Sequence, residues 1–269
     1  MTKMVVVGAR GRIGRKLTAT LRQRGHEVVE VSRSLGVDTV SGVGLTGALN
    51  GAEVVVDVSN SPSLDGADAQ RFFEASARNL LAAGRAAGVR HHVALSIVGV
   101  DRLTSGYFRA KQEQEALIRG SAAGFTILRS TQFFEFIRDV VQEGSDREIA
   151  IAPALVQPVS AQDVAGMLAE IVAAGPHNTI PEIAGAERLR LNEVAAEIAT
   201  AYEDGRRVIA DVHAPYFGAE LGERSLLPGS AARIAPHGFD DWLRESLQPD
   251  WTTTRRADAP NFTTPYPEV

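Results

Sequence analysis

Short apolar runs alternate with segments of helical periodicity up to about residue 150. Runs of β-branched residues that stop at glycine or polar positions are typical of strands buried on both faces. The segments between them repeat apolar residues every three or four positions, as one face of a helix does. The alternation predicts an α/β fold, a Rossmann-type doubly wound parallel sheet with helices on both faces. The predicted strands cover residues 3–8, 27–32, 53–58, 91–97 and 124–129, and the predicted helices cover residues 12–24, 67–88, 106–119 and 132–142.

The pattern is less regular elsewhere. Residues 37–50 are expected to hold a short strand and a helical turn, and the tail from residue 249 to 269, rich in Thr and Pro, is expected to be extended or partly disordered. We divide the chain into a sheet domain at residues 1–154 and a smaller lobe with the tail at residues 155–269. The later predicted elements are a helix from about 160 to 174, a strand at 179–184 that is expected to rejoin the sheet, a helix around 191–198 and a helix around 239–247.

The first strand stops at a glycine turn. Gly8, Gly11 and Gly14 follow the apolar run in the spacing Gly-x-x-Gly-x-x-Gly, and the predicted helix begins within this turn. Without Cβ atoms, the first two glycines let the backbone approach a pyrophosphate, and the third lets the helix pack close to the strand. The free amides of the helix N-terminus, where Ile13 lies, then face the phosphates. The turn predicts a dinucleotide site; a glycine-rich turn without a ligand is the alternative.

Composition narrows the possible functions. The chain has 269 residues, no cysteine and a formal net charge of −5, with a pI near 5.7. We expect no disulfide or thiolate chemistry, no broad nucleic-acid interface, no membrane span, no export signal and a cytoplasmic location. The histidines do not show metal-ligand spacing, so no metal is expected. The pair His91 and His92 is interpreted as an exposed strand start.

Three residues with reactive side chains lie close together in the sequence. Lys111 is one of only three lysines, and it follows Tyr107 by four residues, which places both side chains on one helical face. Ser96 ends the preceding strand, where ligands bind in such sheets. An ammonium near a tyrosine lowers its pKa, so Tyr107 is expected to deliver a proton while Ser96 binds the substrate oxygen. The alternative is a solvated helix in which Lys111 pairs with Glu115 and Tyr107 is half-buried.

The glycine turn, Ser96 and the Tyr107-x-x-x-Lys111 pair together resemble the short-chain dehydrogenase/reductase superfamily. The segments at 96–102, 107–111 and 126–134 are similar to its atypical, NmrA-like NAD(P)H-binding branch. The resemblance covers the first ~185 residues and implies a dinucleotide site and a C-terminal substrate lobe. That branch contains both reductases and redox sensors that turn nothing over. Several members lack the tyrosine that this chain keeps, which favours an enzyme.

The choice of cofactor depends on the end of the second strand. Ser32 and Arg33 lie at its tip, and a hydroxyl with an arginine there suits the 2′-phosphate of NADP(H). Arg10 or Arg12 of the glycine turn is expected to close around the same phosphate. Glu30 points either to solvent or toward the ribose. We therefore expect NADP(H) as the cofactor, with solvated arginines as the alternative.

Further contacts are expected where other strands end. Ser59 and Asn60 follow the strand at 53–58 and are expected to face the ribose or nicotinamide, whereas Asn79 is interpreted as a structural hydrogen-bonding residue. Ser130 and Thr131 leave the strand at 124–129 and are further cofactor candidates, as are Ser96 and Lys111. The expected substrate pocket consists of Gln132, Phe133, Phe134 and Tyr216, with at least one phenylalanine as plain core in the alternative interpretation.

The sequence thus predicts an NADPH-dependent reductase that acts on a small, planar or hydrophobic carbonyl, quinone or azo substrate. Two other functions stay open: a non-catalytic NADP(H) sensor that acts through a protein partner, and an epimerase acting on a nucleotide sugar. The short region after residue 185 disfavours the epimerase. The sequence does not distinguish a monomer from a homodimer.

Overall fold

The computed structural model describes residues 2–143 and 147–248 of the chain. They form two compact units, each built from separate stretches of sequence. The first unit comprises residues 1–96, 106–129 and 164–181, and the second comprises residues 97–105, 130–163 and those from 182 onward. The tail at 249–269 that was expected to be extended lies outside the described residues.

The first unit contains a parallel sheet. Its strands are β1 (Lys3–Val7), β2 (Glu27–Val31), β3 (Val54–Asp57), β4 (His91–Ile97) and β5 (Gly124–Ser130), in the spatial order β5-β4-β3-β1-β2. Val5 of β1 pairs in parallel with Val29 on one side and with Val55 on the other. The strand order reverses beside β1, and ligands bind at such a point in doubly wound sheets.

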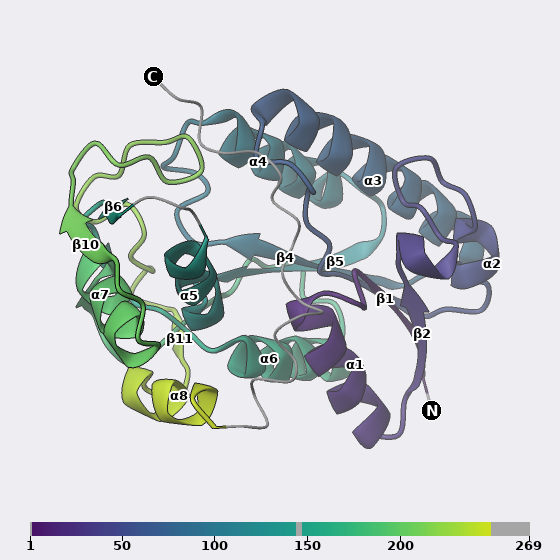
Figure 1. Cartoon of the computed structure of the whole chain (residues 1–269). Helices are drawn as coiled ribbons and strands as arrows, with labels where there is room; N and C mark the ends of the chain where they lie inside the picture. Colours follow the sequence, from purple (N-terminus) through teal and green to yellow (C-terminus); the bar gives the residue numbers. More distant parts are fainter. Residues whose placement is uncertain (1, 144–146, 249–269) are drawn as a thin grey trace. The chain divides into compact units, whose positions relative to one another are not determined.

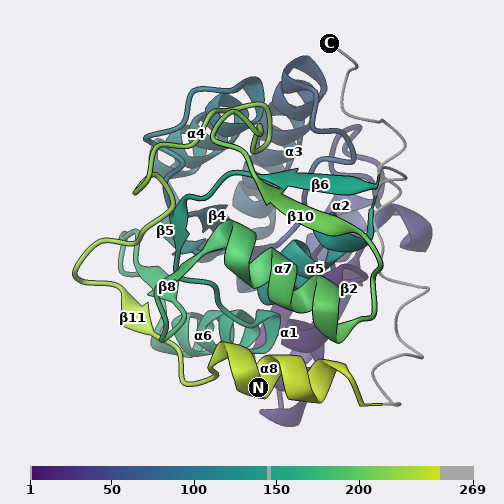
Figure 2. The same ribbon diagram turned by 60° about the vertical axis from the view of Figure 1, so that its left-hand side comes forward.

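Helices cover both faces of this sheet, as predicted. Figures 1 and 2 show α3 (Gly66–Ala87) and α4 (Gly106–Arg119) on one face and α1 (Arg12–Gln23) and α6 (Ala161–Ala174) on the other. The fold is therefore a doubly wound, Rossmann-type α/β fold. Because both faces are covered, the strands bury continuous apolar runs: Val5, Val6, Val55 and Val56 are each 0% exposed.

The expected strand within residues 37–50 does not form. A short 3₁₀ helix, η1 (Arg33–Leu35), and α2 (Leu45–Leu49) bound this region instead. Gly36, Gly42 and Gly44 between them have φ of 79°, 79° and 80°. A run of left-handed glycines makes turns and interrupts the extended backbone that a strand requires.

His91 and His92 are not exposed, contrary to the sequence interpretation. Each is 2% exposed, because helices cover both faces of the strand that they begin. The ring of His91 hydrogen-bonds the Thr126 hydroxyl over 3.0 Å. Burial, with His92 and His177 nearby, lowers the pKa of His91 to about 4, so the ring is neutral at physiological pH.

Asn79, by contrast, is structural as predicted: its amide donates to the carbonyls of Thr39 and Val40 over 2.9 and 2.8 Å.

The second unit is built from short strands and further helices. Its helices include α5 (Phe134–Gln142), α7 (Leu191–Ala201) and α8 (Phe239–Ser246), of which the last two fall where the sequence predicts them. In Figure 2, α7 lies beside β10, and α5 also packs against α7. The strands pair as β6 (Glu148–Ile151) with β10 (Arg207–Ala210), β7 (Leu155–Val156) with β9 (Leu189–Arg190), and β8 (Glu182–Ala184) with β11 (Arg233–Ile234).

Among the described residues, the helices are all too short or too polar to cross a bilayer.

Candidate active site

The glycine turn after β1 is tight enough to require glycine at two of its three positions. A Cβ on Gly14 would lie 2.1 Å from the carbonyl oxygen of Gly8, and a Cβ on Gly8 would lie 2.9 Å from the Cα of Ser59. Gly8 also has a left-handed φ of 78°. The turn is fixed by hydrogen bonds from Gly8 N to Val31 O (3.0 Å) and from Gly11 N to Gly8 O (2.9 Å). A side chain on Gly8 or Gly14 would therefore overlap with neighbouring backbone atoms.

The N-terminus of α1 has the features of an anion site. Gly11 is its N-cap and offers no side chain to the first amides, and the first turn carries no acidic residue. Ile13 in that turn is buried, which anchors the helix to the sheet. Free amides and the positive end of the helix dipole fit a pyrophosphate held above glycines. The turn therefore fits the phosphates of a dinucleotide.

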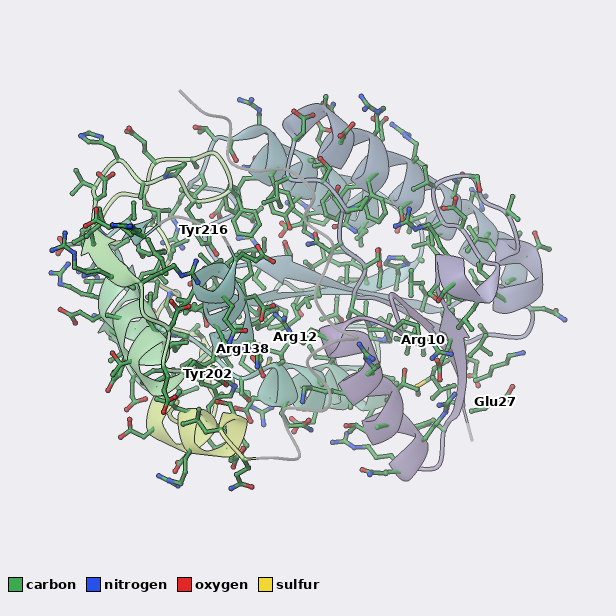
Figure 3. The ribbon with its side chains drawn as sticks, viewed as in Figure 1. Arg10, Arg12, Glu27, Arg138, Tyr202 and Tyr216 are labelled. Carbon is green, nitrogen blue, oxygen red and sulfur yellow. The ribbon has the colours of Figure 1, made fainter. Side chains whose placement is uncertain are left out.

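The end of β2 is rich in arginine. Glu30 is paired with both Arg10 (3.4 Å) and Arg22 (2.8 Å), so its carboxylate is already engaged. Arg33 is exposed in η1, beside hydroxyls of Ser32 and Ser34 that lie 3.0 Å apart. Figure 3 shows Arg10 on the β2 side of the turn, with Arg12 projecting from the other side of α1. Of the two arginines of the glycine turn, Arg10 is the one beside β2.

Tyr107 is buried and hydrogen-bonded. Its hydroxyl donates to Asn60 Oδ1 over 2.8 Å, and the residue is only 3% exposed. Burial raises the pKa of Tyr107 well above its ordinary value, and the bond to Asn60 offsets only part of that increase. The expected lowering of this pKa by Lys111 is therefore absent from the structure. Tyr107 is a neutral phenol that can give a proton.

Lys111 is also buried, which excludes the solvated-helix alternative. Its ammonium donates to Leu95 O (2.9 Å) and to Gln114 Oε1 (2.6 Å), and it lies 4.6 Å from the centre of the Phe73 ring. Burial lowers the pKa of Lys111 to about 8, although the charges of Asp57 and Glu115 act against that shift.

Glu115, the expected partner of Lys111 in the solvated-helix alternative, is bound elsewhere. It accepts two hydrogen bonds from the guanidinium of Arg129 on β5, over 2.9 and 2.7 Å. The i, i+4 spacing suggested an ion pair along the helix, but the bidentate geometry offered by the neighbouring strand is the stronger interaction.

Two polar residues of this site were missed by the sequence analysis. Gln114 connects Lys111 to Asp57, because its amide donates to Asp57 Oδ2 over 3.1 Å. Gln114 lies seven residues after Tyr107 and three residues after Lys111, which places the three side chains on one helical face. The sequence therefore does contain a signal for Gln114. Asp57 ends the apolar run of β3 as a lone charged residue, and it is 2% exposed.

Ser96 lies near the carboxyl end of β4, one residue beyond the carbonyl that holds Lys111. Its hydroxyl is buried and has no hydrogen-bond partner among the described residues. Buried hydroxyls are nearly always paired, so an orphaned one at a strand end is typical of a group that binds a ligand.

The remaining candidates belong to the second unit. Thr131 donates its hydroxyl to Gln157 O over 2.7 Å, and Ser130 is 3% exposed. Both amide atoms of Gln132 are buried without a partner in the described chain. Phe134 is a core residue, 1% exposed and stacked on Trp242 at 5.2 Å, as the alternative interpretation allowed.

Half-buried aromatic rings gather around Tyr216, which is labelled in Figure 3. Its ring lies 4.8 Å from that of Phe217 and 6.2 Å from that of Phe136, and the Phe136 and Phe217 rings are stacked at 5.2 Å. Phe217 has a left-handed φ of 50°, which is strained for an aromatic residue. Phe133, by contrast, caps α5 and is half-buried.

Fold and site together define a Rossmann-type dinucleotide-binding protein: a parallel doubly wound sheet, a glycine turn that leads into a helix N-terminus, and polar groups at the strand ends. Residues 8–174 match the model of the NAD(P)H-binding family, and the chain belongs to that family. The family match agrees with the resemblance to the short-chain dehydrogenase/reductase superfamily, which implied an NAD(P)H-binding protein.

The chain is similar to a curated reductase. It is 27% identical over 214 residues to (4-alkanoyl-5-oxo-2,5-dihydrofuran-3-yl)methyl phosphate reductase of Streptomyces griseus subsp. griseus, with 72% of each chain covered.

Solved structures share its fold. A GDP-6-OMe-4-keto-L-xylo-heptose reductase from C. jejuni matches with a TM-score of 0.70 and 13% identity, over 95% of this chain and 98% of that one. A UDP-glucose 4-epimerase from Thermus thermophilus, in complex with NAD, matches with a TM-score of 0.64 and 18% identity, over 78% and 86%. The comparisons support an oxidoreductase that uses a nicotinamide cofactor.

Proposed function

We propose that this protein is an NADPH-dependent reductase of a small carbonyl, quinone or azo compound with a planar or hydrophobic body. The observation that carries the proposal is the buried set of Tyr107 and Lys111 on α4, with the unpartnered hydroxyl of Ser96 at the end of β4. The reductase activity of the Streptomyces griseus relative supports an enzyme over a sensor.

The proposed cofactor contacts come mostly from the first unit. The amides at the start of α1 would bind the pyrophosphate above Gly8 and Gly14, where a Cβ would otherwise lie. Lys111 would turn a third N–H toward the ribose of the nicotinamide, since an ammonium has three donors and two are directed at Leu95 O and Gln114. The bound cofactor supplies the hydride. Ser59 and Asn60, and Ser130 and Thr131 of the second unit, are the further proposed contacts.

The protein's own residues would handle the proton. As hydride reaches the carbonyl carbon, or one nitrogen of an azo bond, the electron pair of the double bond moves to the other atom of that bond, where negative charge develops. Ser96 would donate a hydrogen bond to that atom, and Tyr107 would transfer its phenolic proton to it. The raised pKa of Tyr107 keeps the proton in place at neutral pH until this moment. The resulting Tyr107 phenolate would lie on the same helical face as the Lys111 ammonium.

The preference for NADPH is proposed from the arginines at the end of β2. Arg33 is exposed there, next to the Ser32 and Ser34 hydroxyls, and a guanidinium with hydroxyls binds a phosphate monoester well. Arg10 is close enough to Glu30 to cancel its charge, which removes a repulsion against a 2′-phosphate. Arg12 is proposed to bind the pyrophosphate side because it projects away from β2 (Figure 3).

The substrate class is proposed from the second unit. The half-buried rings of Phe136, Tyr216 and Phe217 would stack on a planar or apolar body. The unpartnered amide of Gln132 would hydrogen-bond its polar edge, and Phe133 would add apolar surface.

NADPH consumption in the presence of quinones, azo compounds and ketones tests the proposal. We expect turnover of at least one compound and a loss of roughly 10²–10⁴-fold in kcat for Tyr107→Phe, as for removal of a general acid. Lys111→Ala should raise the KM for NADPH as well. The matched control is Tyr202→Phe, which removes the hydroxyl of a half-buried tyrosine in the second unit. Turnover unchanged in both site variants, or absent from the whole panel, contradicts the proposal.

A further inference from the structure

A chain of buried polar side chains beneath α4 joins Lys111 to Asp57. The Lys111 ammonium donates to Gln114 Oε1 over 2.6 Å, and the Gln114 amide donates to Asp57 Oδ2 over 3.1 Å. Lys111, Gln114 and Asp57 are 3%, 2% and 2% exposed. The Gln114 amide therefore couples the Lys111 cation to the Asp57 anion, although these two charged groups do not contact each other. Because the three side chains are buried, water does not screen the charges.

We propose that Asp57 and Gln114 are positioning residues for Lys111: Gln114 fixes where the ammonium lies, and Asp57, acting through Gln114, keeps it charged. The catalytic meaning of this role rests on the proposed function, whereas the linkage of the three groups is a property of the folded chain.

The orientation of each group in the chain is determined by its chemistry. An ammonium can only donate and a carboxylate can only accept, so the Gln114 side chain must turn its oxygen to Lys111 and its nitrogen to Asp57. The other oxygen of Asp57 is already occupied, since Oδ1 accepts from the Ser59 amide (3.0 Å) and hydroxyl (2.6 Å). On its far side, Lys111 is held by Leu95 O at 2.9 Å. The arrangement leaves Gln114 one amide orientation.

The elements around Lys111 present few charges to it. From α4 itself come Tyr107, a neutral phenol, and Glu115, which is paired with Arg129 of β5 but still raises the pKa of Lys111. From α3 comes the ring of Phe73. His92 of β4 faces Asp57 rather than Lys111: burial lowers the pKa of His92, and the charge of Asp57 opposes that shift. Asp57 of β3 and Glu115 are thus the two anions that favour the charged form of Lys111, and the contribution of Asp57 is the larger.

The low lysine content makes a direct test possible. A protein labelled with ¹³C at lysine Cε gives signals from only Lys3, Lys16 and Lys111, and Lys111→Arg identifies the third. We expect the titration midpoint of Lys111 to fall by about one pH unit or more in Asp57→Asn, because the ammonium loses its nearby anion. Gln114→Met, which keeps the length of the side chain, should lower the midpoint as well, and it decides the matter if Asp57→Asn does not fold.

Two matched controls lie on the same helix. Glu113→Gln removes an exposed carboxylate next to Gln114, and Gln112→Met repeats the second substitution at a half-buried position. Both should leave the midpoint where it is in the unaltered protein. An unmoved midpoint in folded Asp57→Asn and Gln114→Met overturns the proposal.

The pH profile of kcat/KM tests the catalytic role separately. In both variants its alkaline limb should move down by the same amount as the Lys111 midpoint, with activity largely recovered at low pH. A loss of rate that is equal at every pH, beside a shifted midpoint, refutes positioning and leaves only a structural link. If the midpoint shifts while the unaltered protein reduces nothing in the compound panel, the proposed function fails and the linkage stands.

Discussion

Arg10 and Glu30 form an ion pair at the end of β2, with 3.4 Å between Nε and Oε2. Glu30 lies where many dinucleotide-binding proteins place an acidic residue to hold a ribose diol. Here Arg22 contacts the same carboxylate at 2.8 Å, so two arginines compete for it with any ribose. The Glu30 carboxylate is therefore engaged by two arginines of the same chain.

Arg33→Ala should remove most of the preference for NADPH over NADH. We expect the unaltered protein to bind NADPH at least about tenfold tighter, because a charge-assisted contact with a phosphate contributes about 1.4 kcal/mol or more. Titration of each cofactor by fluorescence measures the ratio. Arg85→Ala, an exposed arginine at the end of α3, is the control and should not change it. Equal affinities of the unaltered protein for the two cofactors contradict the assignment of NADP(H).

Gly14→Ala should destabilise the fold and abolish cofactor binding. The added Cβ would lie 2.1 Å from Gly8 O and 2.6 Å from the Cα of Ala9, and backbone must move to admit it. The expected loss is about 1–3 kcal/mol of unfolding free energy, as for overpacking in a core.

The matched control for this prediction is Gly166→Ala in the middle of α6. There a new Cβ meets nothing within 4 Å, so the same substitution should stabilise by about 0.5–1 kcal/mol through helix propensity. Chemical denaturation of both variants gives the two values. If the two variants lose similar amounts of unfolding free energy, the glycine turn does not have the steric constraint that we expect.

Stability should fall in acid because of His91. Its pKa is lowered from 6.5 to about 4 in the folded protein, so the unfolded chain binds a proton first as the pH decreases. The loss therefore begins near pH 6.5, grows as the pH falls toward 4, and reaches on the order of a few kcal/mol.

His91→Gln should make the acid dependence of the unfolding free energy shallower between pH 6.5 and 4, since an amide can still bond Thr126 without titrating. His213→Gln is the control, because the His213 side chain is 79% exposed. A pH dependence identical in His91→Gln and the unaltered protein would rule out this histidine as the cause.

Much of the first unit follows from local sequence patterns. The ends of β1, β3 and β4 fall within one residue of their predicted positions, because a buried parallel strand is a short apolar run with polar ends. The failures have physical causes. Left-handed Gly36 and Gly42 replace an expected strand by turns, and His91 is buried because helices cover both sheet faces, which no local pattern reveals.

In the candidate site too, local features could be predicted from the sequence and tertiary contacts could not. The glycine turn and the Tyr107–Lys111 pair could be predicted because turn geometry and helical spacing are local properties. Partner choice could not: Glu115 turns to Arg129 only because β5 lies beside α4, and Gln114 reaches Asp57 across the gap between a helix and a strand. Such contacts are decided by tertiary packing between segments far apart in the sequence.

The four residues from Asp57 to Asn60 have a consequence for redesign. Ser59 lies against Gly8 of the glycine turn, Gln114 donates to Asp57, and Tyr107 donates to Asn60. One short length of backbone therefore sets the spacing between the glycine turn and these two residues of α4. A glycine turn transplanted from another protein to change cofactor preference would meet this loop with the wrong contour. The two segments should therefore be exchanged together, so that Asn60 keeps its hydrogen bond from Tyr107.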